Sequence, residues 1–489
     1  DAQENQLTDA FWSEVNSLPK LDRLKLIGAG VTTAVITACP PLKGLTQLEL
    51  VYTNASCRSV AEVARRIPGL QMLRLSHSGV TDEDISDLAN LPRLEFLSVK
   101  DSKLSLPAIQ SLQKALPATR IESDFGTFDP VDPSAMSTDR RAAERVLALG
   151  GQINIHRESN GSLEFVSELP LESFQLVTVQ VSSTGVTDDD LKYLQGLTSL
   201  TSLSMWDTEI TDRGLANLTD SGRVPLPSLD SIYAQRLNIS DKGIACLAGC
   251  SGVFRLYLSE TQVSDLELVC RTFPNLSQFH IERTSLAGES LAQLKALSHL
   301  QELTISGDQL RNGGSRHLAE LVGLKRLIVV DASKGFEADA LTNLSGLGYL
   351  ELRGVTDVPL SEKFWSTVSA LPRLAEIGFD GWGVSSGFIE QIPAMSQLRS
   401  LTIGHSTADG AAIANAAKRL PQLETLNLNY NDRLDAAGLT HLATLTSIKR
   451  LILPGTPKLT AANIESLHTA LPNCRIESDF GTFEPASDK

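Results

Sequence analysis

The segment 200–218, LTSLSMWDTEITDRGLANL, contains the pattern that decides the fold. Leu203 and Met205 alternate with outward-facing positions, as expected of a short strand with one buried face. After a polar turn, Leu215 and Leu218 lie three residues apart, which is a helical spacing. We therefore predict a strand, a turn and a helix whose apolar side chains share one core.

This pattern recurs along the chain as LxxLxL, a polar turn and another apolar residue, mostly about 24 residues apart. It resembles the leucine-rich repeat, in which each unit covers its apolar face only by stacking on the next. The resemblance implies an α/β solenoid with parallel strands on the concave face and helices on the convex face. The copies begin at Leu21, Leu45, Leu70, Leu94, Leu176, Leu200, Leu229, Val253, Leu276, Leu300, Leu324, Leu347, Leu374, Leu398, Leu423 and Ile448.

A much longer repeat contains these short ones. The stretch LTDAFWSEVNSLPK from Leu7 recurs as LSEKFWSTVSALPR from Leu360, and RIESDFGTF from Arg120 recurs from Arg475. We interpret this as a duplicated unit whose first copy is truncated, giving two tandem arrays. The first array is accordingly expected to start in mid-unit, with its first repeat exposed or disordered.

The break between the copies predicts the domain boundaries. Residues 129–138 contain two prolines and no apolar period, so we expect a linker. A helix from Arg140, and a hairpin that turns at Asn160-Gly161, are expected to form a capping module over residues 139–172. The other predicted parts are the end of the first array (1–128), the second array with its C-terminal cap (173–483) and a tail (484–489).

The ninth position of the repeat is mostly hydroxylic where many leucine-rich repeats have Asn or Cys. Hydroxyl groups both donate and accept over a short reach, so we expect a structural ladder of hydrogen bonds in the turn between strand and helix. The column contains Thr53, Ser78, Ser102, Thr184, Thr208, Thr261, Thr284, Ser406 and Thr456, with Asn431 as the exception.

Three motifs together resemble a known family. DRRAAERVLALGGQINI from Asp139, repeated ITDxGLxxL units and a closing ALPNCRIES are similar to leucine-rich repeat proteins of planctomycete-type bacteria. The resemblance implies an interaction domain without an assigned ligand. The TDxGL units are also similar to the repeats attached to F-boxes in eukaryotic ubiquitin ligases, but the recurring Cys of that class and an F-box are missing.

Two DFG tripeptides, at Asp124 and Asp479, require comparison with protein kinases, because some bacterial relatives carry a serine/threonine kinase ahead of such repeats. A kinase uses DFG downstream of a Gly-rich loop, a strand lysine and an HRD loop. None of these occurs ahead of either tripeptide. Both tripeptides occupy the same place in an array tail, so we predict a capping role.

Other catalytic or metal-binding motifs are sparse. The eight histidines form neither HExxH nor a paired Cys/His spacing suited to zinc. Cys246, Cys250 and Cys270 are interpreted as buried thiols that replace apolar residues. GWGVSSG from Gly381 lacks the Lys-Ser/Thr ending of a phosphate loop, and Asp188–Asp190 is interpreted as a helix start. We therefore predict no enzyme activity, no catalytic residue, no cofactor and no metal.

Composition narrows the range of partners. The 489 residues have a formal net charge of −15 and no visible cluster of Lys and Arg, which argues against a nucleic-acid partner. No run of 18 apolar residues appears, so no transmembrane segment is predicted. Localisation, whether cytoplasmic or exported, and oligomeric state stay open.

A patch of aromatic and polar residues is predicted on the concave face. Outward fifth positions of consecutive repeats carry aromatic side chains in a chain with only 5% aromatic residues. Exposed Trp and Tyr often dominate binding energy. The alternative is that these side chains only pack against one another. The predicted partner-binding residues are Trp206, Tyr233, Gln235, Tyr257, His280 and Glu282.

The sequence thus favours a non-catalytic scaffold that binds a protein partner on its concave face. Two alternatives belong to other classes. One is a sensor or regulatory region of a larger enzyme, such as a receptor-like serine/threonine kinase with its catalytic domain upstream. The other is a structural protein of the cell envelope.

Overall fold

The structure, a computed structural model, describes residues 9–18, 20–89, 91, 94–116, 118–130, 137–157, 163–167, 169–170, 174–218, 226–286, 288–356 and 360–486. Most of the predicted linker, the Asn160-Gly161 turn and the last three residues lie outside this set. The chain divides into two compact units, Asp1–Gln180 and Val181–Lys489. Each unit is described by itself.

The first unit contains a six-stranded sheet in the order β1 to β6, parallel up to β5 and closed by the antiparallel pair β5 and β6. A helix and an antiparallel hairpin with a third strand follow. Its elements are α1 Asp9–Asn16, β1 Arg23–Ile27, α2 Thr33–Thr37, β2 Gln47–Val51, α3 Cys57–Arg66, β3 Met72–Ser76, η1 Asp82–Asp84, α4 Ile85–Leu88, β4 Phe96–Ser98, α5 Leu106–Ala115, β5 Arg120–Ser123, β6 Gly126–Phe128, α6 Thr138–Ala148, β7 Gln152–Arg157, β8 Leu163–Val166 and β9 Phe174–Gln180.

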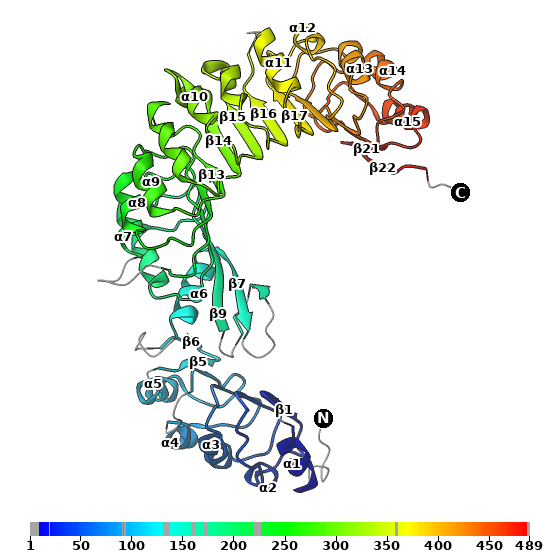
Figure 1. The fold of residues 1–489 in the computed structure, drawn as a ribbon. Helices are drawn as coiled ribbons and strands as arrows, with labels where there is room; N and C mark the ends of the chain where they lie inside the picture. Colours follow the sequence, from blue (N-terminus) through cyan, green and yellow to red (C-terminus); the bar gives the residue numbers. More distant parts are fainter. Residues whose placement is uncertain are drawn as a thin grey trace. The chain divides into compact units, whose positions relative to one another are not determined.

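In the second unit, parallel strands follow one another in chain order and line the inner side of an arc whose outer side is helical (Figure 1). Its elements are η3 Asp188–Leu194, β10 Ser202–Ser204, α7 Asp212–Ala216, β11 Ser231–Tyr233, α8 Asp241–Cys246, β12 Arg255–Tyr257, α9 Leu266–Thr272, β13 Gln278–His280, η4 Gly288–Ala296, β14 Glu302–Ser306, η5 Gly307–Leu310, α10 Gly314–Leu318, β15 Arg326–Val330, η6 Ala332–Lys334, η7 Ala338–Leu341, β16 Tyr349–Arg353, α11 Glu362–Ser369, β17 Glu376–Asp380, α12 Ser386–Glu390, β18 Ser400–Gly404, α13 Gly410–Lys418, β19 Thr425–Asn427, α14 Ala436–Leu442, β20 Arg450–Ile452, α15 Ala461–Ala470, β21 Arg475–Ser478 and β22 Gly481–Phe483.

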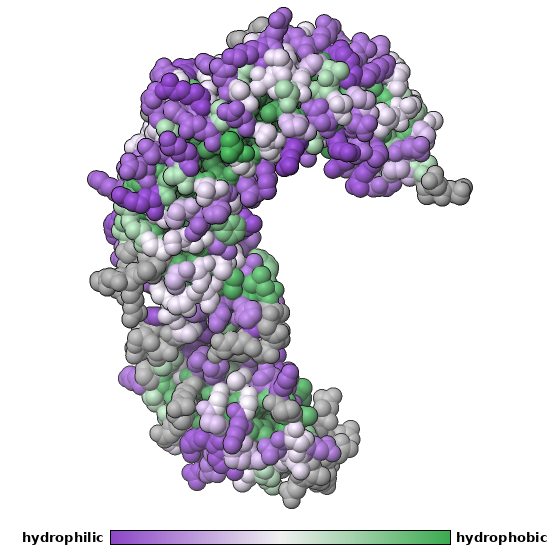
Figure 2. Space-filling model, in the orientation of Figure 1, coloured by the Kyte–Doolittle hydropathy of each residue, from purple (hydrophilic) through white to green (hydrophobic). Residues whose placement is uncertain are grey.

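The core lies between strands and helices, where the repeat pattern places its apolar residues. Leu203 and Met205 are buried, and Ile210 after the turn and Leu215 in α7 close the same core. The fold is a leucine-rich repeat solenoid, which confirms the predicted fold class. Figure 2 shows hydrophilic residues over most of the visible surface of the second unit, as expected when the apolar faces are covered by stacking.

The TDxGL motif joins neighbouring repeats at the start of their helices. Asp212 accepts hydrogen bonds from the backbone N–H and the hydroxyl of Ser240 in the next repeat, at 2.7 and 2.6 Å. Asp188 does the same for Thr211, and Asp241 for Ser264. A Cβ atom on Gly243 would lie 2.6 Å from Asp212 Oδ1, so the motif needs glycine there. The sequence analysis interpreted such aspartates only as helix starts.

Most hydroxyls of the ninth position bond within their own turn, whereas Thr53 Oγ1 and Ser406 Oγ have no partner among the described residues. Thr208 Oγ1 donates to Met205 O at 2.8 Å, and Thr261 Oγ1 donates to Leu258 O at 2.7 Å. These bonds lie in the turn between strand and helix, where they were predicted, and each stays within its own repeat. Asn431 instead joins neighbouring repeats, because its side-chain N–H donates to Ile403 O and its Oδ1 accepts from Ser406 N.

A left-handed backbone marks the eighth position of most repeats. A residue with positive φ turns the chain out of the strand and leaves its side chain on the rim. Glycine fills this position in some repeats. Other repeats place there Tyr52, His77, Asp101, Ser183, Asp207, Arg236, Glu260, Arg283, Asp331, His405 and Tyr430.

Both DFG tripeptides form the turn of a terminal hairpin. Asp124 accepts a hydrogen bond from Asp101 N, and Asp479 accepts one from Gly455 N, both at 2.9 Å. Gly126 and the equivalent glycine of the second copy have φ near 110°. The tripeptides therefore close each sheet with an antiparallel strand.

The first strand is less covered than its neighbour. In β1 the residue Leu26 is buried and Leu24 is only partly buried, whereas Leu48 and Leu50 of β2 are both buried. No helix among the described residues is long and apolar enough to span a membrane.

Candidate functional site

Three consecutive repeats of the second unit place aromatic rings side by side. The strand register aligns Tyr233 of β11, Tyr257 of β12 and His280 of β13 at the fifth position. The two tyrosine rings stack with centroids 4.7 Å apart, and Tyr257 stacks on the imidazole at 4.0 Å. We call these three residues the aromatic row. Parallel strands about 4.8 Å apart impose this spacing.

Each residue of the aromatic row is half-buried, and the central ring, Tyr257, is stacked on both sides. Burial, followed by Tyr233 and Glu302, raises the pKa of the Tyr257 hydroxyl. Burial, followed by the positive charges of Arg326 and Arg353, lowers the pKa of His280 to about 4. His280 is therefore neutral at physiological pH.

The seventh positions of the same repeats form a second row. Gln235 Oε1, Ser259 Oγ and Glu282 Oε2 are buried atoms without a hydrogen-bond partner among the described residues. We call these three residues the polar row. Trp206 occupies the seventh position of the preceding repeat and is half-buried, with no stacked ring among the described residues. Ser259 is not among the predicted partner-binding residues. Its seventh position in the repeat that starts at Val253 places it in the polar row.

The aromatic row ends where the fifth position becomes buried, at Thr304 and Ile328. A second cluster begins beyond them. Arg326 lies 3.5 Å from the centre of the Tyr349 ring, and the hydroxyl of Tyr349 donates to Glu351 at 2.6 Å. The guanidinium of Arg353 donates two hydrogen bonds to the carboxylate of Glu351. This cluster was not predicted from the sequence, because Tyr349 and Arg326 occupy the third position of their repeats and the predicted patch follows the fifth and seventh.

The corresponding strands of the first unit present charges. Lys25 lies 3.1 Å from Glu49, and Arg74 lies 3.4 Å from the same carboxylate. Ser98, next in the series, is buried. The charges at these fifth positions therefore pair with one another, whereas the second unit has aromatic rings at its fifth positions.

Two stacked Tyr/His pairs lie at equivalent eighth positions of the duplicated copies. Tyr52 stacks on His77 at 4.3 Å, and His405 stacks on Tyr430 at 4.8 Å. Each imidazole also contacts a carboxylate, at 3.2 Å in the first copy and 2.8 Å in the second, where the partner is Asp380. Among the described residues, neither imidazole bonds to a Ser, Thr or Cys side chain, so the pairs do not form a nucleophile with its base.

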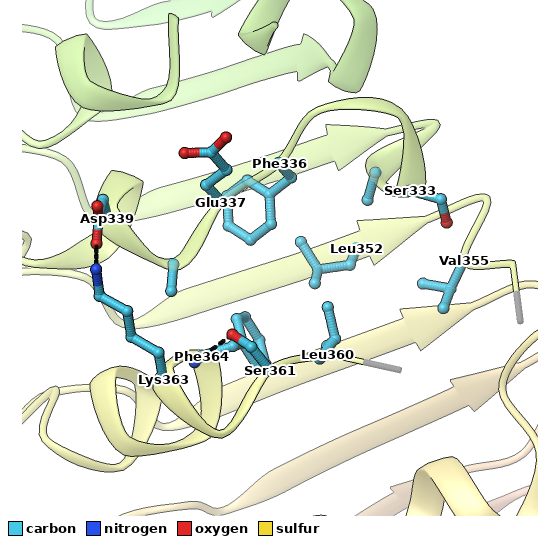
Figure 3. Close-up of a pocket in the computed structure, with 12 residues that line it drawn as sticks. Ser333, Phe336, Glu337, Asp339, Leu352, Val355, Leu360, Ser361, Lys363 and Phe364 are labelled. Carbon is cyan, nitrogen blue, oxygen red and sulfur yellow. Dashed lines mark hydrogen bonds and ion pairs between the residues drawn. The ribbon is translucent and has the colours of Figure 1, made fainter. Parts of the chain in front are cut away.

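A cavity of about 320 Å³ opens beside η6, η7 and α11 (Figure 3). Phe336, Leu352 and Phe364 supply apolar walls, and Lys363 forms an ion pair with Asp339 at the rim. The described lining contains no His or Cys. The cavity can accept an apolar group but offers no nucleophile with an adjacent base.

Cysteines and metal ligands give no reactive centre in the described part of the chain. Cys250 and Cys270 are buried, as expected of thiols that replace apolar residues, and burial raises their pKa to about 11 and about 12. Cys246 is partly exposed, and burial, followed by Asp212, raises its pKa. Thiols with raised pKa are poor nucleophiles. No group of three or more metal-ligating side chains occurs among the described residues.

The class defined by this architecture is the leucine-rich repeat solenoid, with an aromatic and a polar row on its strand face. No protein-family model matches the chain. Human podocan-like protein 1 is 25% identical over 393 residues, which cover 78% of this chain and 66% of that protein. The chain thus spans just under two thirds of that relative.

Solved structures with similarity to the chain include an internalin, InlF, from Listeria monocytogenes. It is 21% identical, with a TM-score of 0.37, over 72% of this chain and 91% of its own. The TLR13–ssRNA13 complex is 17% identical, with a TM-score of 0.33, over 96% of this chain and 54% of its own. The fold assignment rests on the repeats and strand order of the chain itself.

Proposed function

We propose that the protein is a non-catalytic scaffold that binds a protein partner through the strand face of the second unit. The binding residues are Trp206, Tyr233, Gln235, Tyr257, His280 and Glu282. The bacterial type of the repeats belongs to the same proposal and rests on the sequence motifs.

The aromatic row is the observation that carries this proposal. Its rings stack on one another at 4.7 and 4.0 Å, and each residue is only half-buried. Side chains that are already ordered lose less conformational entropy on binding, and Tyr combines a large apolar area with a polar group. Stacking and binding are therefore compatible roles for these residues.

Site-specific crosslinking tests the proposal. A photoreactive phenylalanine at position 233 is expected to crosslink a protein from the native cell, and the same group at Thr440, exposed on helix α14, is not. The captured protein is then purified and titrated against the full chain. An aromatic hot-spot residue is worth about 2 kcal/mol or more, which corresponds to about thirty-fold in affinity, so Trp206→Ala combined with Tyr257→Ala should weaken binding by about thirty-fold or more.

Two results would contradict the proposal. One is unchanged affinity of the double variant for the purified partner. The other is equal crosslinking from the strand face and from the outer helix.

A further inference from the structure

The polar row contains oxygen atoms to which no group in the described part of the chain donates a hydrogen bond. Gln235 Oε1, Ser259 Oγ and Glu282 Oε2 are buried in three consecutive repeats and have no hydrogen-bond partner among the described residues. An amide oxygen and an ionised carboxylate oxygen can only accept hydrogen bonds. Buried polar atoms without partners are costly, so the row is suited to a ligand that brings N–H groups.

Two carboxylates beside the aromatic row also lack a cation. Among the described residues, neither Glu282 nor Glu302 forms an ion pair, in contrast to Glu351, which Arg353 grips with two hydrogen bonds. Glu302 is the first residue of β14, at the third position of its repeat, and lies in register with Gln278 of β13. Its charge contributes to the raised pKa of Tyr257. Neither carboxylate is therefore neutralised by an ion pair within the described part of the chain, although Arg326 lies next to Glu302 in the strand register.

Arg326 and Arg353 already have partners of their own, and the imidazole of His280 carries no charge at pH 7. Arg326 is stacked on Tyr349, and Arg353 is bound to Glu351. His280 is neutral at pH 7, since burial and then these two arginines lower its pKa to about 4. The aromatic row therefore adds polarisable ring edges and faces without adding positive charge.

We propose that the aromatic and polar rows together bind an arginine side chain of the protein partner, with its guanidinium directed to Glu282. This inference rests on the proposed function and names the chemistry of the partner. Guanidinium is planar, stacks on aromatic rings and offers five N–H donors in a fixed fork, so it can contact adjacent acceptors and rings together. An ammonium group is a more strongly hydrated point charge and matches this arrangement less well.

Peptide selection tests the inference. The full chain is immobilised and panned with phage-displayed random dodecapeptides, and the selected pool is sequenced against the input library. We expect an excess of arginine over both the library and lysine. For a selected synthetic peptide, replacing arginine by citrulline, which keeps the shape but removes the charge, should weaken binding about ten-fold or more.

Matched variants of the protein locate the contact. Glu282→Gln should weaken the arginine peptide about ten-fold, because a charge-assisted hydrogen bond is lost. Glu376→Gln changes the net charge equally at an exposed third position of a repeat, where β17 begins, and should change affinity less than two-fold. Circular dichroism melting of both variants checks that each is folded.

The outcomes separate the two proposals. An arginine excess that depends on Glu282 and not on Glu376 supports the inference. A pool without arginine excess, or equal losses for both variants, overturns it. Peptides that lack arginine but still require Tyr257 would leave the proposed function standing, whereas peptides that bind the Tyr257→Ala chain unchanged would count against both.

Discussion

Burial makes His280 a neutral histidine within the aromatic row. Its imidazole stacks on Tyr257 at 4.0 Å and its pKa is lowered to about 4 by burial, then by Arg326 and Arg353. In the unfolded chain a histidine has an ordinary pKa near 6.5, so below that pH the unfolded state takes up a proton that the folded state does not. Acid therefore destabilises the fold through this residue.

The pH dependence of stability tests this. Between pH 6.5 and pH 4 the wild type should lose up to about 3 kcal/mol through His280, and His280→Gln should remove that loss. The loss is absent above pH 6.5 and complete near pH 4. Denaturant titrations at each pH measure it, with exposed His299→Gln as the control. Identical pH profiles for the wild type and His280→Gln would contradict the assignment.

Glycine in the TDxGL motif is a second determinant at the scale of single residues. A Cβ atom at Gly243 would lie 2.6 Å from Asp212 Oδ1 and 2.9 Å from Leu215 Cδ1. Gly387, also helical, has only Ser385 Oγ within reach, at 3.9 Å. Comparing alanine at these two positions therefore distinguishes the cost of the steric clash at Gly243 from the gain in helix propensity that both substitutions share.

We expect Gly243→Ala to destabilise the protein by about 1–3 kcal/mol, since the clash outweighs the better helix propensity of alanine. Gly387→Ala should be neutral or stabilising by up to about 1 kcal/mol. Urea unfolding of both variants measures these changes. Equal effects of the two substitutions would show that the aspartate contact does not fix the motif.

At the scale of elements, neighbouring strands and helix starts are joined by different contacts. The strands align the aromatic row through their register, and the helix starts are joined by carboxylates that reach the next repeat. Stacked aromatic pairs add about 0.5–1.5 kcal/mol each beyond the area they bury. Tyr257 lies between two such contacts, so it stabilises the array while part of its side chain stays exposed to a partner.

Substitution of Tyr257 separates these two roles. Tyr257→Ala should cost about 1–3 kcal/mol through two lost stacks, whereas Tyr257→Phe keeps both stacks and should cost less than about 0.5 kcal/mol. Thermal melting followed by circular dichroism measures both. If alanine were no more destabilising than phenylalanine, the stacks would contribute nothing to folding.

The sequence predicted the strands and the aromatic row well because both follow from local spacing. Leu203 and Met205 alternate within one strand, and the fifth positions of neighbouring repeats meet once the fold is a parallel solenoid. The contacts of Asp212 with Ser240 and the missing partners of Glu282 depend on side-chain directions across repeats, which spacing does not encode. The carboxylate ladder, the polar row and the Tyr349 cluster were therefore found only in the structure.

At the scale of the whole molecule, the duplicated copies reuse the same elements. Helices α1 and α11, strands β1 and β17, and the terminal hairpins β5–β6 and β21–β22 recur in the same order. The residues at their fifth positions differ, since the first copy has Lys25, Glu49 and Arg74 where the second has Gly378, Thr402 and Asn427. The boundaries predicted at residues 128, 138, 172 and 483 stay a prediction.

Two compact units should unfold separately. Each has its own core, so we expect calorimetry of the full chain to resolve at least two transitions. Removing residues 1–128, which contain the core cluster from Trp12 to Ile121, should abolish the transition of the first unit and leave the other. A single two-state transition, with equal calorimetric and van't Hoff enthalpies, would contradict this division.

The central claim is that the strand face of the repeats from Leu200 to Glu282 recognises a protein. Hydroxyl-radical footprinting of the full chain, free and bound to the crosslinked partner, tests it most directly, because it reports the solvent exposure of each side chain. The account predicts protection of Trp206, Tyr233 and Tyr257, with unchanged labelling of exposed Trp382. Protection confined to the outer helices, with the aromatic row labelled as in the free chain, would contradict it.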